Sequence, residues 1–333
     1  MRLCSLVLIL LGPACPAAPY VAFVANVPVH SYSPNACIRV VDLATGEAVS
    51  VSEGLFSARS PAWAPDGSCV VFEAETGGQQ DIFLCRPDGS ERINVTDTSD
   101  RWECSPVALA ADQVAYLSGP DRTEVVLKDL ASGRTRTLSE AECFHSGLAR
   151  NGDGSMLGVV CFRRLAGPGH IHLLPTDGGA PRRLTTEPGL YSAPCFTADG
   201  KAVLFAFDGP SIGGRTRGLA RMALDGEPEL LAEQGYPMSP VSISADGAVI
   251  AYAAAPQYHT TWVHVIRGGD PERLAVSPFH NTGWPSVSAD GRLLAYHGVY
   301  AARFTVHVVD LQTGEDKNLC PEGTGVNPVI SPR

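Results

Sequence analysis

The sequence lacks features that would mark several common classes of protein. It is short of positive charge: 25 Lys and Arg face 35 Asp and Glu, so the formal net charge is -10. A general nucleic-acid binder needs a basic surface, so we expect no nucleic-acid partner. No block of like charge indicates a disordered tail. After the first residues no apolar stretch reaches about 18 residues, so we predict no transmembrane segment.

The motifs of several enzyme classes are missing as well. There is no Gly-x-Ser-x-Gly nucleophile elbow, no His-Glu-x-x-His zinc motif and no glycine-rich phosphate loop before a helix. No two of the ten cysteines are spaced as Cys-x-x-Cys, which argues against a zinc ribbon or a thioredoxin-type site. These absences favour a protein that is not an enzyme, although scattered histidines leave a metal-dependent activity open.

The first residues have the layout of a secretory signal peptide. Arg2 precedes an apolar run that ends at Leu11, and small residues follow as far as Ala18. We predict a signal peptide over residues 1–18 and a periplasmic or extracellular mature protein. The sequence around Cys15 loosely resembles a lipoprotein cleavage site. A lipoprotein anchored through Cys15 is therefore the alternative to a free exported protein.

A repeat runs through the rest of the chain, which is rich in turn formers, with 34 Gly and 26 Pro. Residues 60–67 read SPAWAPDG, and an apolar run, DIFL at 81–84, PDG at 87–89 and RINVT at 92–96 follow. The plan recurs, with first-turn aspartates 41 to 47 residues apart at Asp66, Asp112, Asp153, Asp199, Asp246 and Asp290. Four short strands in about 45 residues are typical of one β-propeller blade.

The two ends of the chain each hold part of a repeat. Residues 20–52 supply the later strands of a blade, and residues 327–332, which read NPVISP, match SPAWAP at 60–65 as a first strand. Joining the ends completes a seventh blade and removes exposed sheet edges. We therefore predict an all-β fold. Residues 19–333 form a single, monomeric seven-bladed β-propeller, in which N- and C-terminal strands close one composite blade.

The repeat resembles the WD40-like PD40 repeats of the TolB-like β-propeller family. The similar segments are 60–67, Asp81-Ile82-Phe83, Asp88-Gly89 and Arg183-Leu184-Thr185. The resemblance implies a propeller fold, and we expect an exported, non-enzymatic module that binds a protein or an envelope ligand without a cofactor. TolB itself has six blades and an additional α/β domain, whereas the count here is seven. Oligogalacturonate lyases are similar seven-bladed propellers that hold a metal with His and Gln side chains. A carbohydrate-active enzyme with a divalent metal is therefore the alternative function.

The propeller topology predicts where a site would lie. Loops that lead into each blade share one face with the loops between second and third strands, and we call this the loop face. Its predicted ligand-binding residues are Arg59, Arg101, Trp102, Glu103, His145, Tyr191, Tyr236, His280, Trp284 and His297. Aromatic rings and positive charge suit an anionic or sugar-like ligand, or an acidic segment of a partner protein. The alternative is that long loops simply hold residues of every kind.

Two smaller predictions concern metal and disulfide chemistry. His145 and His280, in loops that lead into two blades, are the candidate metal ligands, although surface histidines with satisfied hydrogen bonds and no metal are the alternative. An even number of cysteines in an exported chain permits disulfides. Cys69 and Cys85 flank one hairpin and are expected to lie nearly opposite each other, so they are the candidate disulfide. Two buried thiols are the alternative.

Overall fold

The computed structural model describes residues 19–26, 33–119, 123–139, 143–163, 167–192, 194–233, 236–237, 240–257, 260–274, 281–300 and 303–332. The predicted signal peptide, Cys15 and His280 lie outside this part of the chain, as does the side chain of Tyr236. Every secondary-structure element in the described part of the chain is a β-strand, which confirms the all-β prediction. No helix in these ranges is long and apolar enough to cross a membrane.

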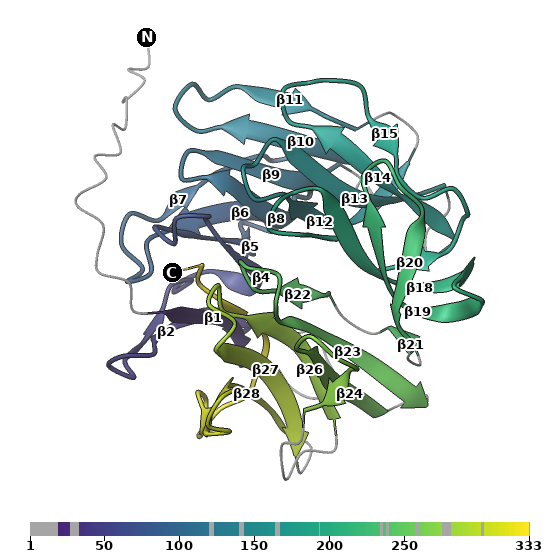
Figure 1. The fold of residues 1–333 in the computed structure, drawn as a ribbon. Helices are drawn as coiled ribbons and strands as arrows, with labels where there is room; N and C mark the ends of the chain where they lie inside the picture. The colour runs from purple at the N-terminus through teal and green to yellow at the C-terminus, as the bar shows by residue number, and fades with distance from the viewer. Residues whose placement is uncertain are drawn as a thin grey trace.

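Seven small sheets stand in a ring, each with its strands in antiparallel order (Figure 1). Blade 1 is β4 (Phe56–Trp63), β5 (Val70–Thr76), β6 (Gln79–Cys85) and β7 (Ile93–Asn94). Blade 2 is β8 (Cys104–Ala110), β9 (Gln113–Ser118), β10 (Glu124–Asp129) and β11 (Thr135–Thr137). Blade 3 is β12 (Phe144–Arg150), β13 (Met156–Phe162), β14 (Gly169–Pro175) and β15 (Arg182–Arg183).

In the next two blades the innermost strand is split into two short pieces. Blade 4 is β16 (Leu190–Tyr191), β17 (Cys195–Phe196), β18 (Ala202–Ile212), β19 (Arg215–Ala223) and β20 (Pro228–Ala232). Blade 5 is β21 (Tyr236–Pro237), β22 (Ser242–Ile243), β23 (Ile250–Gln257), β24 (Thr260–Ile266) and β25 (Glu272–Arg273). Blade 6 is β26 (Asn281–Val287), β27 (Leu293–Tyr300), β28 (Arg303–Asp310) and β29 (Asp316–Asn318).

The seventh sheet, the closing blade, joins the two ends of the described chain and confirms the predicted composite blade. Its order is β30 (Gly325–Ile330), β1 (Tyr20–Ala25), β2 (Cys37–Asp42) and β3 (Ala48–Ser50). The register pairs Val21 with Ile330 and Ala25 with Gly325. Tyr20 and Ser331 then exchange two hydrogen bonds, of 2.8 and 2.9 Å. The strands from the two ends of the described chain therefore lie in one sheet.

The closing blade is also bonded to both of its neighbours. The Trp63 indole of blade 1 donates a hydrogen bond to the backbone oxygen of Val329, at 3.0 Å. On the other side the backbone nitrogen of Ile330 donates to Ser286 Oγ of blade 6, at 2.9 Å. The Trp63 ring also stacks on Tyr20, with 6.0 Å between centroids. The innermost strand β30 thus holds together three successive blades.

The hydrophobic core lies between the blades because the second strand of each blade is buried on both faces. In β5, Val70 and Phe72 pack towards the closing blade, whereas Val71 packs towards blade 2. Alternation along a strand sends successive side chains to opposite faces of a sheet. Since each face meets another blade, the strand is apolar on both sides, as is typical of fully buried strands.

Serine or threonine at the end of the fourth strand ties that strand to the third. The hydroxyls of Ser52, Thr96, Ser139 and Thr185 each accept a hydrogen bond from a third-strand backbone nitrogen, at 2.8 to 3.0 Å. In blade 6 a cysteine takes this place, and Cys320 Sγ accepts from the Val306 nitrogen at 3.0 Å. The repeated hydroxyl therefore has a structural role, since it pairs a backbone donor that would otherwise be left buried.

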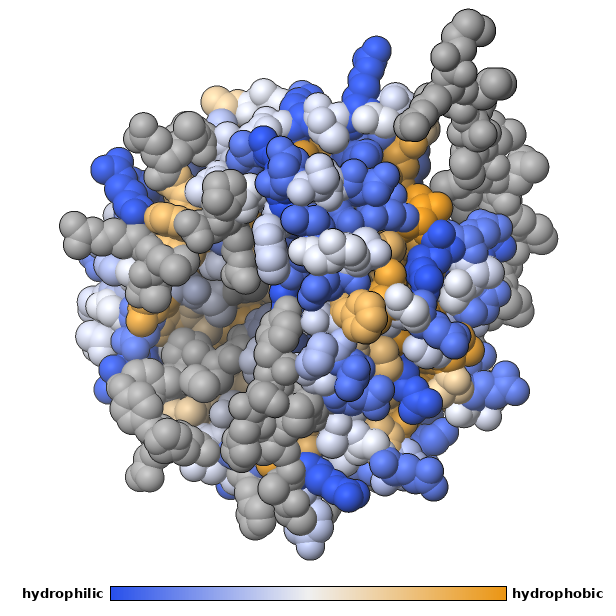
Figure 2. All heavy atoms as spheres, turned by 180° about the vertical axis from the view of Figure 1, so that it is seen from behind, coloured by the Kyte–Doolittle hydropathy of each residue, from blue (hydrophilic) through white to orange (hydrophobic). Residues whose placement is uncertain are grey.

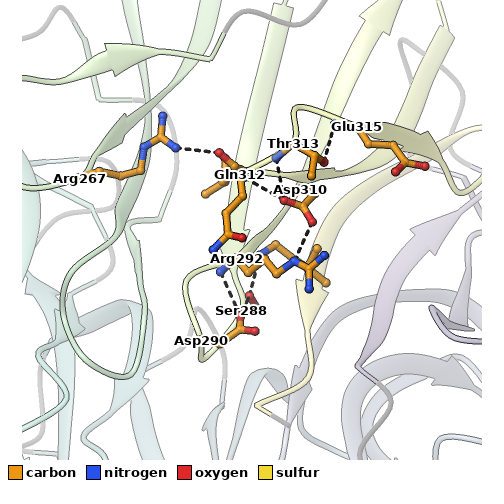
Figure 3. A network of polar contacts seen from close by, with 10 residues as sticks. Arg267, Ser288, Asp290, Arg292, Asp310, Gln312, Thr313 and Glu315 are labelled. Atoms are coloured by element: carbon orange, nitrogen blue, oxygen red, sulfur yellow. Dashed lines mark hydrogen bonds and ion pairs between the residues drawn. The ribbon is translucent and has the colours of Figure 1, made fainter.

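The face opposite the loop face, here called the turn face, is made of short turns stabilised by aspartate. In blade 6, Asp290 accepts hydrogen bonds from Ser288 Oγ and the Arg292 nitrogen, while Asp310 accepts from Gln312, Thr313 and the Arg292 side chain (Figure 3). These bonds lower the pKa of both aspartates, with the hydroxyl of Ser288 and the guanidinium of Arg292 as the largest causes. Aspartate on this face serves turn geometry, as its residue type suggests.

The bond between Trp63 and β30 gives a test of ring closure. Trp63→Phe keeps a ring against Tyr20 but leaves the Val329 oxygen without its indole donor. We expect equilibrium urea unfolding to show a loss of about 1 kcal/mol, the usual value of one such hydrogen bond. Trp102→Phe is the control, because the Trp102 side chain is 54% exposed. Equal stability of wild type and Trp63→Phe would mean that this bond does not hold the closing blade.

Candidate functional site

The innermost strands of five blades bend at the same place, just below the loop face. Four non-glycine residues that precede proline have positive φ there: Ser60 (53°), Ser105 (52°), Trp284 (47°) and Asn327 (53°). Blade 3 has no proline at this point and uses Gly147, with φ 65°. The strand register shifts at each of these positions. Left-handed backbone in a residue other than glycine costs of order 1 kcal/mol, and it redirects the side chain.

Large hydrophobic side chains are exposed mainly on the loop face. Five lie there: Phe56 (56% exposed), Trp102 (54%), Leu190 (53%), Tyr300 (50%) and Trp284 (39%). Within the described ranges the sixth is Val49 (37%), in the outermost strand β3. Seen from behind Figure 1, hydrophobic residues reach the surface in separate places among hydrophilic ones (Figure 2). The five loop-face residues come from blades 1, 2, 4 and 6, so they are spread around the ring rather than gathered on one blade.

The predicted arginines of the mouth are already paired with carboxylates. Arg59 bonds through Nε to Glu73 and through a terminal nitrogen to Gln80. Glu73, 3% exposed, also accepts a hydrogen bond from the Ser105 backbone nitrogen at 2.7 Å, so it links blades 1 and 2. Arg101 lies 2.6 Å from Glu124. The positive charge expected from sequence is thus largely balanced, which weakens the case for an anionic ligand.

Glu103 and His145, which the sequence placed at the mouth, are buried beneath it and correct that expectation. Glu103 is 1% exposed and accepts hydrogen bonds from Thr98 Oγ1 at 3.0 and 3.1 Å. Burial is the largest cause that raises its pKa. His145 is 3% exposed within β12. Both lie inside or just before an innermost strand, where the neighbouring blade covers them.

His297 is likewise not in a loop but in the middle of β27, 8% exposed. Its ring stacks on Trp284, with centroids 5.3 Å apart, and meets Phe304 edge-on. Its Nδ1 is buried and has no hydrogen-bond partner among the residues that the structure describes. Burial lowers the pKa of His297 to about 4, because a charged imidazole would lose its water there. His297 therefore supports the exposed Trp284 ring from below as a neutral side chain.

The remaining predicted residues have different positions. Tyr191, in β16, is half-buried, donates to the Glu187 carbonyl at 2.6 Å and meets the Phe205 ring edge-on. Tyr236 starts β21, but its side chain lies outside the described residues, as does all of His280. The predicted pairing of His145 with His280 stays a prediction. In the described ranges no group of three or more His, Cys, Asp or Glu side chains is arranged as a metal centre.

The candidate disulfide is not formed. Val70, not Cys69, lies opposite Cys85 in the hairpin. A shift of one residue turns a side chain to the other face of a sheet. Cys69 therefore packs towards blade 2 and Cys85 towards the closing blade, both as thiols. Burial raises the pKa of each to about 12, which keeps them protonated.

Sequence reasoning missed Glu73 and Gln80, which hold Arg59. Glu73 interrupts the apolar run of β5, and Gln80 is the second residue of β6, before its apolar run starts at Ile82. A charged residue inside a strand that is otherwise buried needs a partner, because an unpaired buried charge is costly. That interruption was the available signal for a buried ion pair below the loop face.

Comparisons with known proteins agree on the fold. No family model matches the chain. It is 27% identical over 143 residues to the "Protein TolB homolog" of Chlorobium chlorochromatii (strain CaD3). The match covers 42% of this chain and 31% of the relative, so less than a third of that protein is spanned.

Solved structures cover nearly all of the chain at lower identity. TolB from Acinetobacter baumannii aligns over 94% of this chain and 67% of its own, with TM-score 0.61 and 18% identity. A puromycin hydrolase mutant gives TM-score 0.72 and 16% identity over 92% of this chain and 52% of its own. An oligogalacturonate lyase in complex with manganese gives 0.63 and 13% over 89% and 83%. At these identities the likeness concerns the fold alone.

The burial of His297 leads to a prediction about how the stability of the folded protein depends on pH. A folded-state pKa near 4 is below the ordinary value of 6.5, so the unfolded chain binds this proton more readily. We expect its stabilising contribution to be complete above pH 6.5 and to decrease as pH falls from about 6.5 to 4. An NMR titration should place the midpoint of His297 near pH 4. His297→Gln should remove part of the stability change in that window, and a midpoint near 6.5 would contradict the burial.

Proposed function

We propose that this chain, a TolB-like β-propeller, is an exported, non-enzymatic module that binds a protein segment or a saccharide-containing envelope ligand on its loop face. The exposure of Phe56, Trp102, Leu190, Tyr300 and Trp284 on that face is the observation that carries the proposal. Soluble proteins expose single hydrophobic residues everywhere, but here five of six such residues in the described ranges share one face.

The chemistry of these residues indicates what kind of ligand would bind. Aromatic rings give a large contact area at a small cost in side-chain entropy, since they have two rotatable bonds. They can contact apolar side chains of a protein or the C–H faces of a sugar. Because Arg59 and Arg101 are paired with carboxylates, their role is to form the polar rim rather than to attract an anion. We therefore expect binding with a modest dependence on salt.

The ring geometry explains why the loop face rather than the turn face would serve binding. Turn-face loops such as that of Asp290 are short and their polar groups are used within the turn. Loops on a rigid scaffold are the common position of binding residues. The left-handed residue Trp284 extends this surface into the mouth of the ring, where His297 fixes its ring.

The alternative from the sequence is a metal-dependent carbohydrate enzyme similar to oligogalacturonate lyase. It rests on likeness of fold at 13% identity. Conversion of oligogalacturonate to an unsaturated product by the purified protein with manganese would establish this alternative in place of a non-enzymatic module.

Export makes a separate prediction. If residues 1–18 are a signal peptide, the protein recovered from the periplasm begins near Pro19. Intact mass spectrometry should then show loss of this segment and no added lipid. A mature chain that begins at Cys15 and carries acyl groups would instead establish the lipoprotein, and an uncleaved chain in the cytoplasm would contradict export.

Binding on the loop face can be tested by site-specific photocrosslinking in the native cell. A photoreactive amino acid at Tyr300, on the loop face, should give adducts that the same group at Lys201, in a turn-face turn, does not. With the probe at Tyr300, Trp102→Ala should reduce the adducts several-fold. Val49→Ala is the matched control, because Val49 is an exposed hydrophobic residue far from the loop face in the fold.

The outcomes separate the possible ligands. Adducts that a protease removes indicate a protein segment, and adducts that resist protease but yield to glycosidases indicate a saccharide. Equal adducts from both faces, or adducts that Trp102→Ala leaves unchanged, would contradict the proposal.

A further inference from the structure

Two exposed aromatic rings on the loop face are accompanied by acidic side chains at blades 1 and 2. Phe56, the first residue of β4, and Trp102, in the loop before β8, are the most exposed large hydrophobic side chains of the described ranges. Four exposed or half-exposed carboxylates belong to the same region, one opposite Phe56 in the β4–β5 register and three in the loops that lead to the two rings: Glu75, Glu53, Asp97 and Asp100. We call these six residues the acidic sector of the loop face.

The arginines that the structure describes near the loop face in blades 1 and 2 are already engaged. Arg59 is held by Glu73 and Gln80. Arg101 lies 2.6 Å from Glu124. Within the described ranges the four carboxylates of the acidic sector take part in no ion pair. Negative charge is therefore left over beside the two exposed rings, where a bound ligand can balance it.

Buried acidic groups support the loop that carries Trp102. Asp81 and Glu103 are 2% and 1% exposed. Thr98 joins them, since its backbone nitrogen donates to Asp81 Oδ1 at 3.2 Å and its hydroxyl donates to Glu103 at 3.0 Å. Among the described residues the hydrogen-bond donors to both carboxyl groups are neutral, and neither group is in an ion pair. The loop is thus held in place before a ligand binds, and the acidic groups below it favour a cation at its surface.

We propose that the acidic sector binds a cationic segment of a partner protein, an inference that rests on the proposed binding function of the loop face. Lysine or arginine side chains of that segment lie over the rings of Trp102 and Phe56, where cation–π attraction is available. Their charges meet the carboxylates of the sector, which have no other partner. An anionic ligand, such as a uronate polymer, would meet like charge here, which disfavours the wrong partner. A neutral saccharide would leave the carboxylates unbalanced.

The charges and the rings contribute to binding in different ways. Exposed ion pairs are individually weak and are screened by salt, so the carboxylates chiefly determine which partner binds. The rings, together with the apolar stems of lysine and arginine, provide most of the contact area. This division agrees with the modest dependence on salt expected for the loop face. The charge of this partner is opposite to that of the anionic ligand or acidic segment expected from the sequence.

The first test uses the purified mature protein and three short fluorescent peptides, which differ only in whether lysine, glutamine or glutamate occupies the same positions. In fluorescence polarisation the lysine peptide should bind about tenfold more tightly than the glutamate peptide. Asp97→Asn with Asp100→Asn should reduce this preference several-fold, and asparagine tolerates the positive φ of 48° at position 97. The matched control is Glu47→Gln with Glu315→Gln, which removes two exposed carboxylates from turn-face turns and changes the net charge equally.

The peptide results decide the sign of the charge. Equal affinity for the three peptides would overturn the proposal, as would tighter binding of the glutamate peptide. A preference for lysine that Asp97→Asn with Asp100→Asn leaves unchanged, or that both double variants reduce alike, would overturn it as well, because the preference would then come from the net charge of the whole protein.

A second measurement separates this inference from the function on which it rests. A photoreactive amino acid at Phe56 in the native cell should give adducts with a protein segment that is richer in lysine and arginine than in aspartate and glutamate. A neutral or acidic segment, or a saccharide, would overturn the cationic partner and leave binding on the loop face intact. If neither Phe56 nor Tyr300 gave adducts, the proposed binding function would itself be contradicted.

Discussion

The pairing of β1 with β30 is the constraint on which the rest of the ring depends. Each blade buries one face against the blade before it and the other against the blade after it, so an open ring would leave two apolar faces in water. Closure through Val21 and Ile330 covers both. Because the two strands come from opposite ends of the described chain, this blade forms only when distant segments meet, and such pairing carries a high entropic cost.

Closure also fixes the geometry of the loop face. The innermost strands contact one another around the channel, from β30 through β4 and β8 to β12, and from β22 through β26 back to β30. Left-handed residues bend five of them at the same height, and Trp284 is presented there with His297 behind it. Strain of this kind persists only where the surrounding structure determines it, which a closed ring does. The exposed aromatic residues are thus placed by strands that cannot move independently.

Much of the fold could be predicted from the sequence, because a repeat of about 45 residues with Asp-Gly turns has few solutions. The composite blade followed from matching residues 327–332 to residues 60–65. The site was predicted less well. Propeller topology indicates near which face of the ring a residue lies, but it does not indicate whether the neighbouring blade buries its side chain. His145, Glu103 and His297 are buried for that reason. The disulfide prediction failed on a register difference of one residue, which hairpin spacing alone does not determine.

Native-state hydrogen exchange of the closing blade tests ring closure most directly. The amides of β1 and β30 should exchange as slowly as those of β5 and β6 in blade 1, because opening at the closing blade would expose the core and so require global unfolding. Exchange of β1 and β30 at a rate well above that of β5 and β6, in the absence of denaturant, would contradict closure as the constraint that holds the ring.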